Sequence, residues 1–126
     1  RSPELAIIED MNARLRRGAQ KICDEMGLEV TFEKVGGFDP VEFDAGCVSA
    51  VRNAAERLGY SHRDLISGAG HDAMILSALC PTAMLFIRCR EGISHNPAES
   101  VLPEDADLAA RTMLRFIKSL EDIHRA

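Results

Sequence analysis

A short stretch rich in residues that interrupt regular structure, Gly36-Gly37-Phe38-Asp39-Pro40, divides this chain of 126 residues into two unequal parts. Before the break, the sequence predicts one helix over residues 2–26 and one strand over residues 28–33. After it, the sequence predicts helix, strand, helix, strand and helix in that order. A single helix and a single strand cannot bury a core, so the first part should be a remnant of a larger domain or lean on other structure. The second part has the layer pattern of an α/β fold with a parallel or mixed sheet.

The helix expected in the first part has local signals at both ends. Ser2 suits the N-cap, and Pro3 suits the first helical position, where its missing N–H costs nothing. Gly27 suits the C′ position at the other end. Residues 28–33 then alternate between apolar and polar side chains, which is the period of a half-buried strand. Along the helix, apolar residues recur in steps of three and four: Leu5, Ile8, Met11, Leu15, Ala19, Ile22 and Met26.

The second part begins with a helix that we expect from about Asp44 to Gly59. A short strand at residues 65–66 follows, and then a helix of about ten residues that Pro81 stops. Residues 83–87, Ala-Met-Leu-Phe-Ile, show no polar alternation, which is typical of a central strand covered on both faces.

The last predicted helix starts at Pro103 and has Glu104 and Asp105 in its first turn, where carboxylates suit the positive end of the helix dipole. We interpret His124, near the end of this helix, as a surface group. A buried stripe is expected along it: Leu108, Thr112, Phe116, Leu120 and Ile123.

Composition argues against several classes of protein. Hydrophobic residues make up 46% and charged residues 28%, which is ordinary globular usage and not that of a disordered chain. The net charge of -5, with one Tyr and no Trp, gives nucleic-acid binding little support. The apolar run at residues 83–87 is far too short to span a membrane. Four cysteines without a CxxC pair predict reduced, mostly buried thiols in a cytoplasmic protein: Cys23, Cys47, Cys80 and Cys89.

Two loops follow predicted strands, at the strand ends where ligands gather in open α/β sheets. Residues 67–72, Ser-Gly-Ala-Gly-His-Asp, let backbone approach a ligand closely, although a purely structural turn is the commoner use of such a loop. In the second loop, His95 is a candidate metal ligand, general base or solvated side chain. A lone histidine cannot hold zinc, and His62, His71 and His124 show no HxH or HxxxH spacing.

Three blocks taken together resemble a known family. They are Ser-Gly-Ala-Gly-His-Asp-Ala at residues 67–73, Cys-Pro-Thr-Ala-Met at 80–84 and Gly-Ile-Ser-His-Asn-Pro-Ala-Glu at 92–99. Their order and intervals are similar to the C-terminal signature of M20 metallo-amidohydrolases of the hydantoinase/carbamoylase type. That group includes N-carbamoyl-L-amino-acid hydrolases and allantoate amidohydrolases. The resemblance implies the C-terminal portion of a zinc-dependent enzyme that cleaves linear amide C–N bonds of N-carbamoyl amino acids or of ureido acids such as allantoate.

The resemblance also implies a domain organisation. In the family, an α/β catalytic domain of the zinc-peptidase-like type is interrupted by a ferredoxin-like lid or dimerisation domain. Residues 1–36 would then be the helix–strand remnant of the lid domain, and residues 37–126 the C-terminal part of the catalytic domain. The Gly36–Pro40 break would be the hinge between them. A cytoplasmic homodimer, joined through its lid domains, is the assembly that the resemblance implies.

Carried over to this sequence, the family's motif makes His95 a ligand of one of two divalent ions (zinc, or manganese, cobalt or nickel). Arg1 would grip the substrate carboxylate with its planar fork. The first loop would line the substrate pocket with Gly68, Ala69, Gly70 and His71.

The remaining ligands and the general-base Glu of the family belong to a region that this sequence lacks. We therefore expect no catalytic residue in this chain, and expect that by itself it neither binds zinc tightly nor hydrolyses substrate. A sequence that begins at Arg1 and not at Met also favours a piece of a longer chain.

Other interpretations stay open. The chain could belong to an M20 peptidase or aminoacylase, although the blocks at residues 67–73 and 80–84 favour the carbamoylase side. It could also be an α/β interaction module that kept the fold and lost the chemistry. As a subdomain with exposed sheet edges, it would tend to form dimers or to swap domains.

Overall fold

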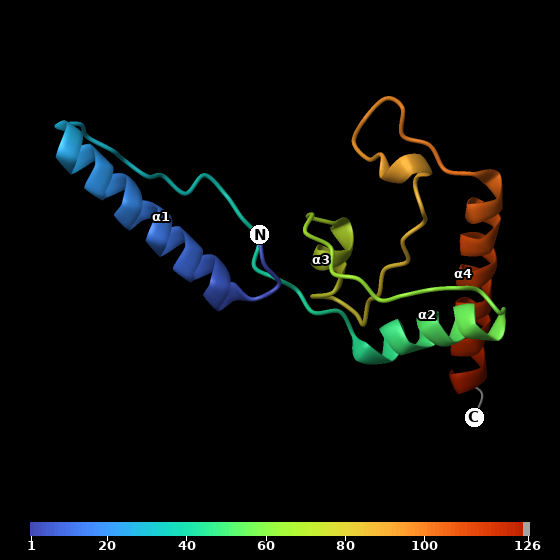
Figure 1. Ribbon diagram of the computed structural model, residues 1–126. Helices are drawn as coiled ribbons and strands as arrows, with labels where there is room; N and C mark the ends of the chain where they lie inside the picture. The colour runs from blue at the N-terminus through green and yellow to red at the C-terminus, as the bar shows by residue number, and fades with distance from the viewer. Residues whose placement is uncertain (125–126) are drawn as a thin grey trace. The chain divides into compact units, whose positions relative to one another are not determined.

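The computed structural model describes residues 1–124, and side chains as far as residue 120. The chain forms two compact units, one of Arg1–Glu42 with Ile66–Gly70 and one of Phe43–Leu65 with His71–Ala126. Within the described residues, the regular elements are α1 (Leu5–Met26), α2 (Ala45–Arg57), α3 (Asp72–Leu76), the 3₁₀ turn η1 (Arg90–Gly92) and α4 (Pro103–His124) (Figure 1). No helix in this part of the chain is both long and apolar enough to cross a membrane.

The strands predicted at residues 28–33, 65–66 and 83–87 are absent from the described structure, so the expected α/β sheet is not confirmed. These segments run as irregular chain (Figure 1). Residues 83–87 make no backbone hydrogen bond to another backbone group among the residues described. A strand exists only where a neighbouring strand pairs with its N–H and C=O groups. The apolar pattern of a segment predicts which of its faces could be buried, but it does not show whether a neighbouring strand is present to pair with it.

Helix α1 ends where the sequence predicts and starts later. It begins at Leu5, with Glu4 at the N-cap and no side-chain cap. The Ser2 hydroxyl instead accepts a hydrogen bond from the Glu4 amide at 3.1 Å, so the expected N-cap is a local turn just before the helix. At the other end Gly27 has φ 67°, and the Leu28 amide donates to the Cys23 carbonyl at 2.9 Å. This left-handed termination is the one that a glycine at C′ favours.

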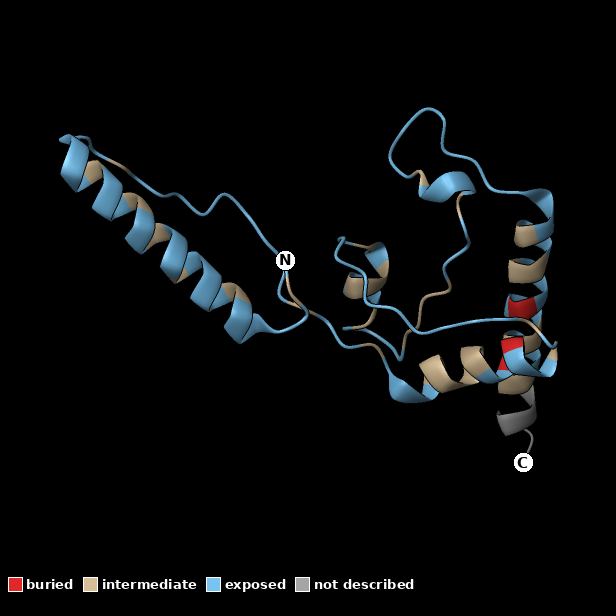
Figure 2. Cartoon of the chain, viewed as in Figure 1, coloured by how far each residue is buried: buried red, intermediate tan, exposed pale blue. Residues whose placement is uncertain are grey.

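The apolar face predicted for α1 is largely uncovered. The helix has no buried residue, and most of its surface is exposed (Figure 2). The chain that follows the helix makes a contact back to it, where the Arg16 guanidinium lies 4.9 Å from the centroid of the Phe32 ring. Unit 1 therefore has no core of its own, as the sequence predicts. Large side chains that stay between 44% and 65% exposed are Leu5, Met11, Leu15, Ile22 and Met26.

The buried residues of unit 2 lie where α2 packs against α4. Ala54 is 3% exposed and Ala55 is 7% exposed on α2, and Thr112 on α4 is 3% exposed (Figure 2). The Thr112 hydroxyl donates to the Leu108 carbonyl at 2.8 Å, which satisfies the one polar side chain that is buried among residues 1–120. The predicted stripe of α4 is thus partly confirmed, since Leu108, Phe116 and Leu120 are half-buried. Ile123 and His124 lie beyond the residues whose side chains are described.

Helix α2 lies where the sequence predicts it, and a side-chain cap marks its start. The Asp44 carboxylate accepts a hydrogen bond from the Cys47 amide at 2.7 Å. That hydrogen bond is the main reason why the pKa of Asp44 lies below its ordinary value. Gly59, with φ 72°, ends the helix. The start of α4 at Pro103 is also confirmed.

The helix expected to run about ten residues toward Pro81 is shorter than predicted. Helix α3 covers only Asp72–Leu76, and the chain continues through separate turns. One of these turns is closed by the bond from the Cys80 amide to the Leu76 carbonyl at 3.1 Å. The chain still leaves helical geometry before Pro81, because proline cannot supply an amide to continue it.

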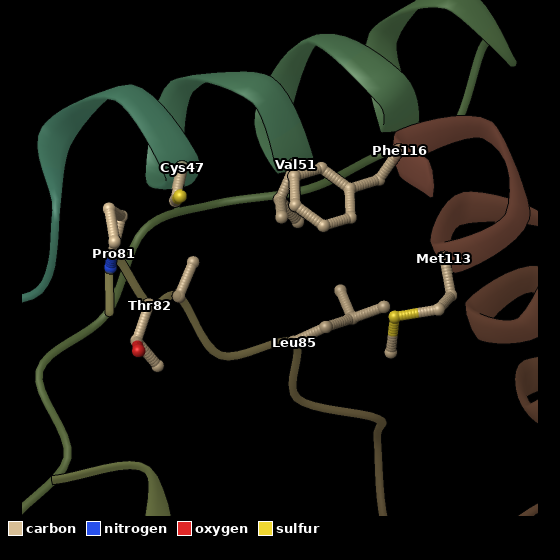
Figure 3. A pocket seen from close by; sticks show the side chains of 8 residues that line it. Cys47, Val51, Pro81, Thr82, Leu85, Met113 and Phe116 are labelled. Carbon is tan, nitrogen blue, oxygen red and sulfur yellow. The ribbon is translucent and has the colours of Figure 1, made fainter. Parts of the chain in front are cut away.

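Residues 81–85, at the start of the expected central strand, line a pocket together with α2 and α4 (Figure 3). The Asp44 amide donates to the Thr82 carbonyl at 3.1 Å and ties this segment to the start of α2. The pocket has a volume of about 210 Å³ and mostly apolar walls. Its lining residues are Cys47, Val51, Pro81, Thr82, Ala83, Leu85, Met113 and Phe116.

The cysteines are only in part as predicted. All four are free, but none is buried and Cys80 is exposed. Burial raises the pKa of the Cys47 thiol, and the neighbouring Asp44 raises it further. A thiol in such surroundings stays protonated and is a poor nucleophile, so Cys47 is not a candidate for covalent chemistry.

Candidate functional site

His95 lies in a loop that is closed by its own backbone. The Arg90 amide donates to the Ser100 carbonyl at 2.8 Å, which joins the two ends of the loop. Inside it, the Glu99 amide donates to the Asn96 carbonyl at 2.8 Å. The Asn96 side chain accepts from the Ala98 amide at 2.9 Å. This segment thus holds its shape through contacts that are short-range in sequence.

The backbone of His95 is left-handed, with φ 56°. Glu91, in the same loop, also has φ 56°, and these are the two non-glycine residues with positive φ in the described chain. For a residue with a side chain this conformation costs roughly 1–2 kcal/mol, and such strain tends to gather at functional sites. A carboxylate oxygen of Glu99 accepts the His95 amide at 2.7 Å and offsets that cost. The imidazole itself is exposed and makes no hydrogen bond or ion pair to the residues that the structure describes.

Unit 1 brings together two of the predicted substrate-binding residues. The Arg1 guanidinium donates to the Gly68 carbonyl at 2.8 Å. A Cβ added to Gly68 would lie 3.8 Å from the Arg1 side chain, which is ordinary contact. A guanidinium carries five N–H donors, so this bond leaves donors for a ligand carboxylate.

The glycines of the first loop are not required by backbone strain. Neither Gly68 nor Gly70 is among the residues with positive φ. A Cβ on Gly70 would meet the Phe38 ring at 3.9 Å, again ordinary contact. The Ala69 amide donates to the Ser67 hydroxyl at 3.2 Å, which makes this a local turn. Backbone conformation and local crowding therefore do not explain why these two positions are glycine.

His71, predicted to line the same substrate pocket, belongs to unit 2. It is half-buried at the N-cap of α3. Its ring meets the Phe86 ring edge-on, with centroids 5.6 Å apart and an interplanar angle of 70°. This geometry is favourable for an aromatic pair and fixes the orientation of the imidazole.

The described residues do not form a complete metal site. No group of three or more His, Cys, Asp or Glu side chains among them could hold a metal ion. Zinc takes at least three protein ligands, with imidazole among its preferred donors. The donor chemistry of His95 suits one position in such a set, and the rest of the set is not in this part of the chain.

The chain belongs to peptidase family M20/M25/M40, whose family model matches residues 4–119. It is 44% identical over 123 residues to an N-carbamoyl-L-amino-acid amidohydrolase of Rhizobium meliloti, covering 98% of this chain and 30% of that protein. It is 32% identical over 120 residues to the allantoate amidohydrolase of Escherichia coli (strain K12), covering 95% of this chain and 29% of that protein.

Solved structures agree with this assignment. A hydantoinase/carbamoylase family amidase from Burkholderia multivorans is 46% identical to this chain and superposes with a TM-score of 0.87. The match covers 94% of this chain and 29% of that one. The chain thus spans between 22% and 30% of the length of the curated relatives reported for it. The family resemblance seen at residues 67–99 is confirmed.

Proposed function

We propose that this chain is the C-terminal part of an M20 metallo-amidohydrolase that cleaves a C–N bond in an N-carbamoyl amino acid or in a ureido acid such as allantoate. The observation that carries the proposal is the 44% identity to an N-carbamoyl-L-amino-acid amidohydrolase across 98% of the chain. In this proposal His95 ligates one of two divalent metal ions. The exposed imidazole on a closed loop supports that role.

The substrate-binding role falls to Arg1 and to residues 68–71, Gly-Ala-Gly-His. The bond from Arg1 to the Gly68 carbonyl supports a shared site for the guanidinium and the glycine loop, with the fork available to a substrate carboxylate. We assign the general base for hydrolysis to segments outside this sequence.

The domain division proposed for the whole protein assigns residues 1–36 to a lid or dimerisation domain and residues 37–126 to an α/β catalytic domain. The uncovered apolar face of α1 and the unit boundary after Glu42 support a division near the Gly36–Pro40 break. The proposed division does not explain why residues 66–70 group with unit 1, since it assigns them to the catalytic domain. The strands of the catalytic sheet would form where neighbouring strands from the rest of the protein pair with residues 83–87. A cytoplasmic homodimer is part of the same proposal.

A peptidase or aminoacylase is the second candidate, because the matching family model is itself described as a peptidase family. Parallel assays of the whole protein with an N-carbamoyl amino acid, allantoate, a dipeptide and an N-acyl amino acid separate these activities. Turnover of the dipeptide alone would favour the peptidase. Folded whole protein that turns over none of them would favour an interaction module.

The test of the metal role is His95→Ala in the whole protein. We expect it to lose about one bound divalent ion per chain and about 100-fold or more in kcat/KM, because a site with a missing ligand holds its ion weakly. Metal content is measured by elemental analysis of the purified protein. His62→Ala is the matched control, since the His62 ring lies at the surface, where it bonds to the Tyr60 carbonyl at 3.2 Å and lies 3.5 Å from the Glu56 carboxylate. Unchanged metal content in His95→Ala would remove His95 from the site.

A further inference from the structure

We propose that Glu99 is the positioning residue for His95: its carboxylate holds the His95 backbone in the conformation that presents the imidazole. This inference rests on the proposed metal role of His95. The contact that carries it joins a Glu99 carboxylate oxygen to the His95 amide at 2.7 Å. Glu99 acts through the main chain and leaves the imidazole free to bind.

The Glu99 carboxylate uses both of its oxygens inside the loop. One accepts the His95 amide, and the other lies 3.8 Å from the Cys89 sulfur, whose thiol donates to it. An ionised carboxylate only accepts hydrogen bonds, and a bond to a charged acceptor is roughly twice as strong as one between neutral groups. Glu99 thereby links Cys89, which precedes η1, to His95.

The backbone of His95 needs such a support. Its φ of 56° lies in a region that side chains rarely adopt and that persists only where the surroundings over-determine it. An N–H group held by a carboxylate fixes the peptide plane before His95, and the direction of the side chain follows from that plane. A ligand aimed in advance costs less to order when the metal binds.

A tight turn brings Glu99 back over His95. The Glu99 amide donates to the Asn96 carbonyl at 2.8 Å, and Pro97 occupies the position of this turn that favours proline. The Asn96 side chain accepts the Ala98 amide and stabilises the same turn. The turn made by Asn96 and Pro97 thus places Glu99 where its carboxylate can orient His95.

The experiment compares Glu99→Ala with Glu99→Gln in the whole protein. The glutamine keeps an oxygen that can accept the His95 amide, and alanine removes it. In Glu99→Ala we expect hydrogen exchange of the His95 amide to rise by about 10-fold or more, and metal affinity to fall roughly 10–100-fold. In Glu99→Gln both quantities should return most of the way to wild type. The visible spectrum of the Co²⁺-loaded protein should change in the alanine variant.

Glu91→Gln is the matched control, because Glu91 lies in the same loop with the same φ and, among the described residues, forms no hydrogen bond with His95. Amide exchange in α4 reports whether each variant is folded. If His95→Ala keeps its metal, the proposed metal role of His95 fails whatever Glu99 does. If His95→Ala loses metal while Glu99→Ala keeps wild-type amide protection and affinity, the positioning role is overturned. It is overturned equally if Glu99→Gln loses metal as alanine does while the His95 amide stays protected.

Discussion

At the scale of single residues, the chain's most informative side chains act on backbone amides. Asp44 accepts the Cys47 amide at the start of α2, and Glu99 accepts the His95 amide in the loop. The sequence predicts that a helix starts near Asp44 but does not name the cap, although an aspartate before an apolar-periodic segment is a common N-cap. It does not predict the second, because the role of Glu99 depends on a turn through Pro97 that only the folded loop makes visible. The four-residue interval between His95 and Glu99 is the signal that could have pointed to it.

The cap at Asp44 predicts a pH dependence. The amide of Cys47 lowers the pKa of Asp44 below its ordinary value of 3.8, so the folded state binds its proton less readily than the unfolded state does. This contribution to stability is therefore present above the unfolded pKa and is lost as pH falls through the lower, folded pKa. Asp44→Ala should lower the Tm at neutral pH, and the difference from wild type should shrink in acid. Thermal unfolding between neutral pH and about pH 3 measures it.

Asp39→Ala is the comparison, because Asp39 is also an exposed aspartate but lies in the loop before α2 and caps nothing. A Tm difference for Asp44→Ala that stays constant with pH would contradict the capping explanation.

At the scale of elements, helix ends could be predicted and sheet could not. Gly27, Gly59 and Pro103 set the ends of their helices through backbone geometry that one or two residues determine. The strands at residues 28–33 and 83–87 depend on hydrogen-bonding partners, and no local pattern contains a partner. For α3, the sequence predicts that the helix ends before Pro81, which is correct. It does not predict that the helix ends as early as Leu76.

Two glycines of α1 predict opposite effects of the same substitution. Gly27→Ala places a Cβ at φ 67° and should destabilise the helix end by about 1–2 kcal/mol. Gly18→Ala lies in the helix interior, where a Cβ meets nothing within 4 Å, and should stabilise by about 0.5–1 kcal/mol. Chemical denaturation of each variant of the whole protein measures both. Effects of the same sign would show that α1 does not end at Gly27 in solution.

At the scale of the whole molecule, many large apolar side chains of the described residues are exposed. Its buried residues among those described are Ala54, Ala55 and Thr112, and the face of α1 is open. Exposed apolar patches of this kind mark surfaces that pack against other chain segments or other molecules. The family resemblance and the lack of a core in residues 1–36 could be predicted from the sequence, but the sparse burial within unit 2 is visible only in the structure.

The exposed apolar surface and the incomplete set of metal ligands predict how the 126-residue chain behaves in isolation. We expect it to bind no stoichiometric zinc and to show no turnover of an N-carbamoyl amino acid, because the described residues hold no set of three ligands. We also expect association that increases with concentration. Elemental analysis, a substrate assay and sedimentation velocity test these expectations. A well-behaved monomer with one zinc per chain and measurable hydrolysis would contradict both the fragment interpretation and the exposed-face argument.

The bond between the Arg90 amide and the Ser100 carbonyl has a consequence for the order of folding. Closing so short a loop costs little chain entropy, and contacts between residues near in sequence form quickly. The contact between α2 and α4 joins residues far apart in sequence and forms more slowly. The His95 loop can therefore reach its final shape early, so that under the proposed metal role the imidazole is already in place when distant parts of a longer polypeptide arrive.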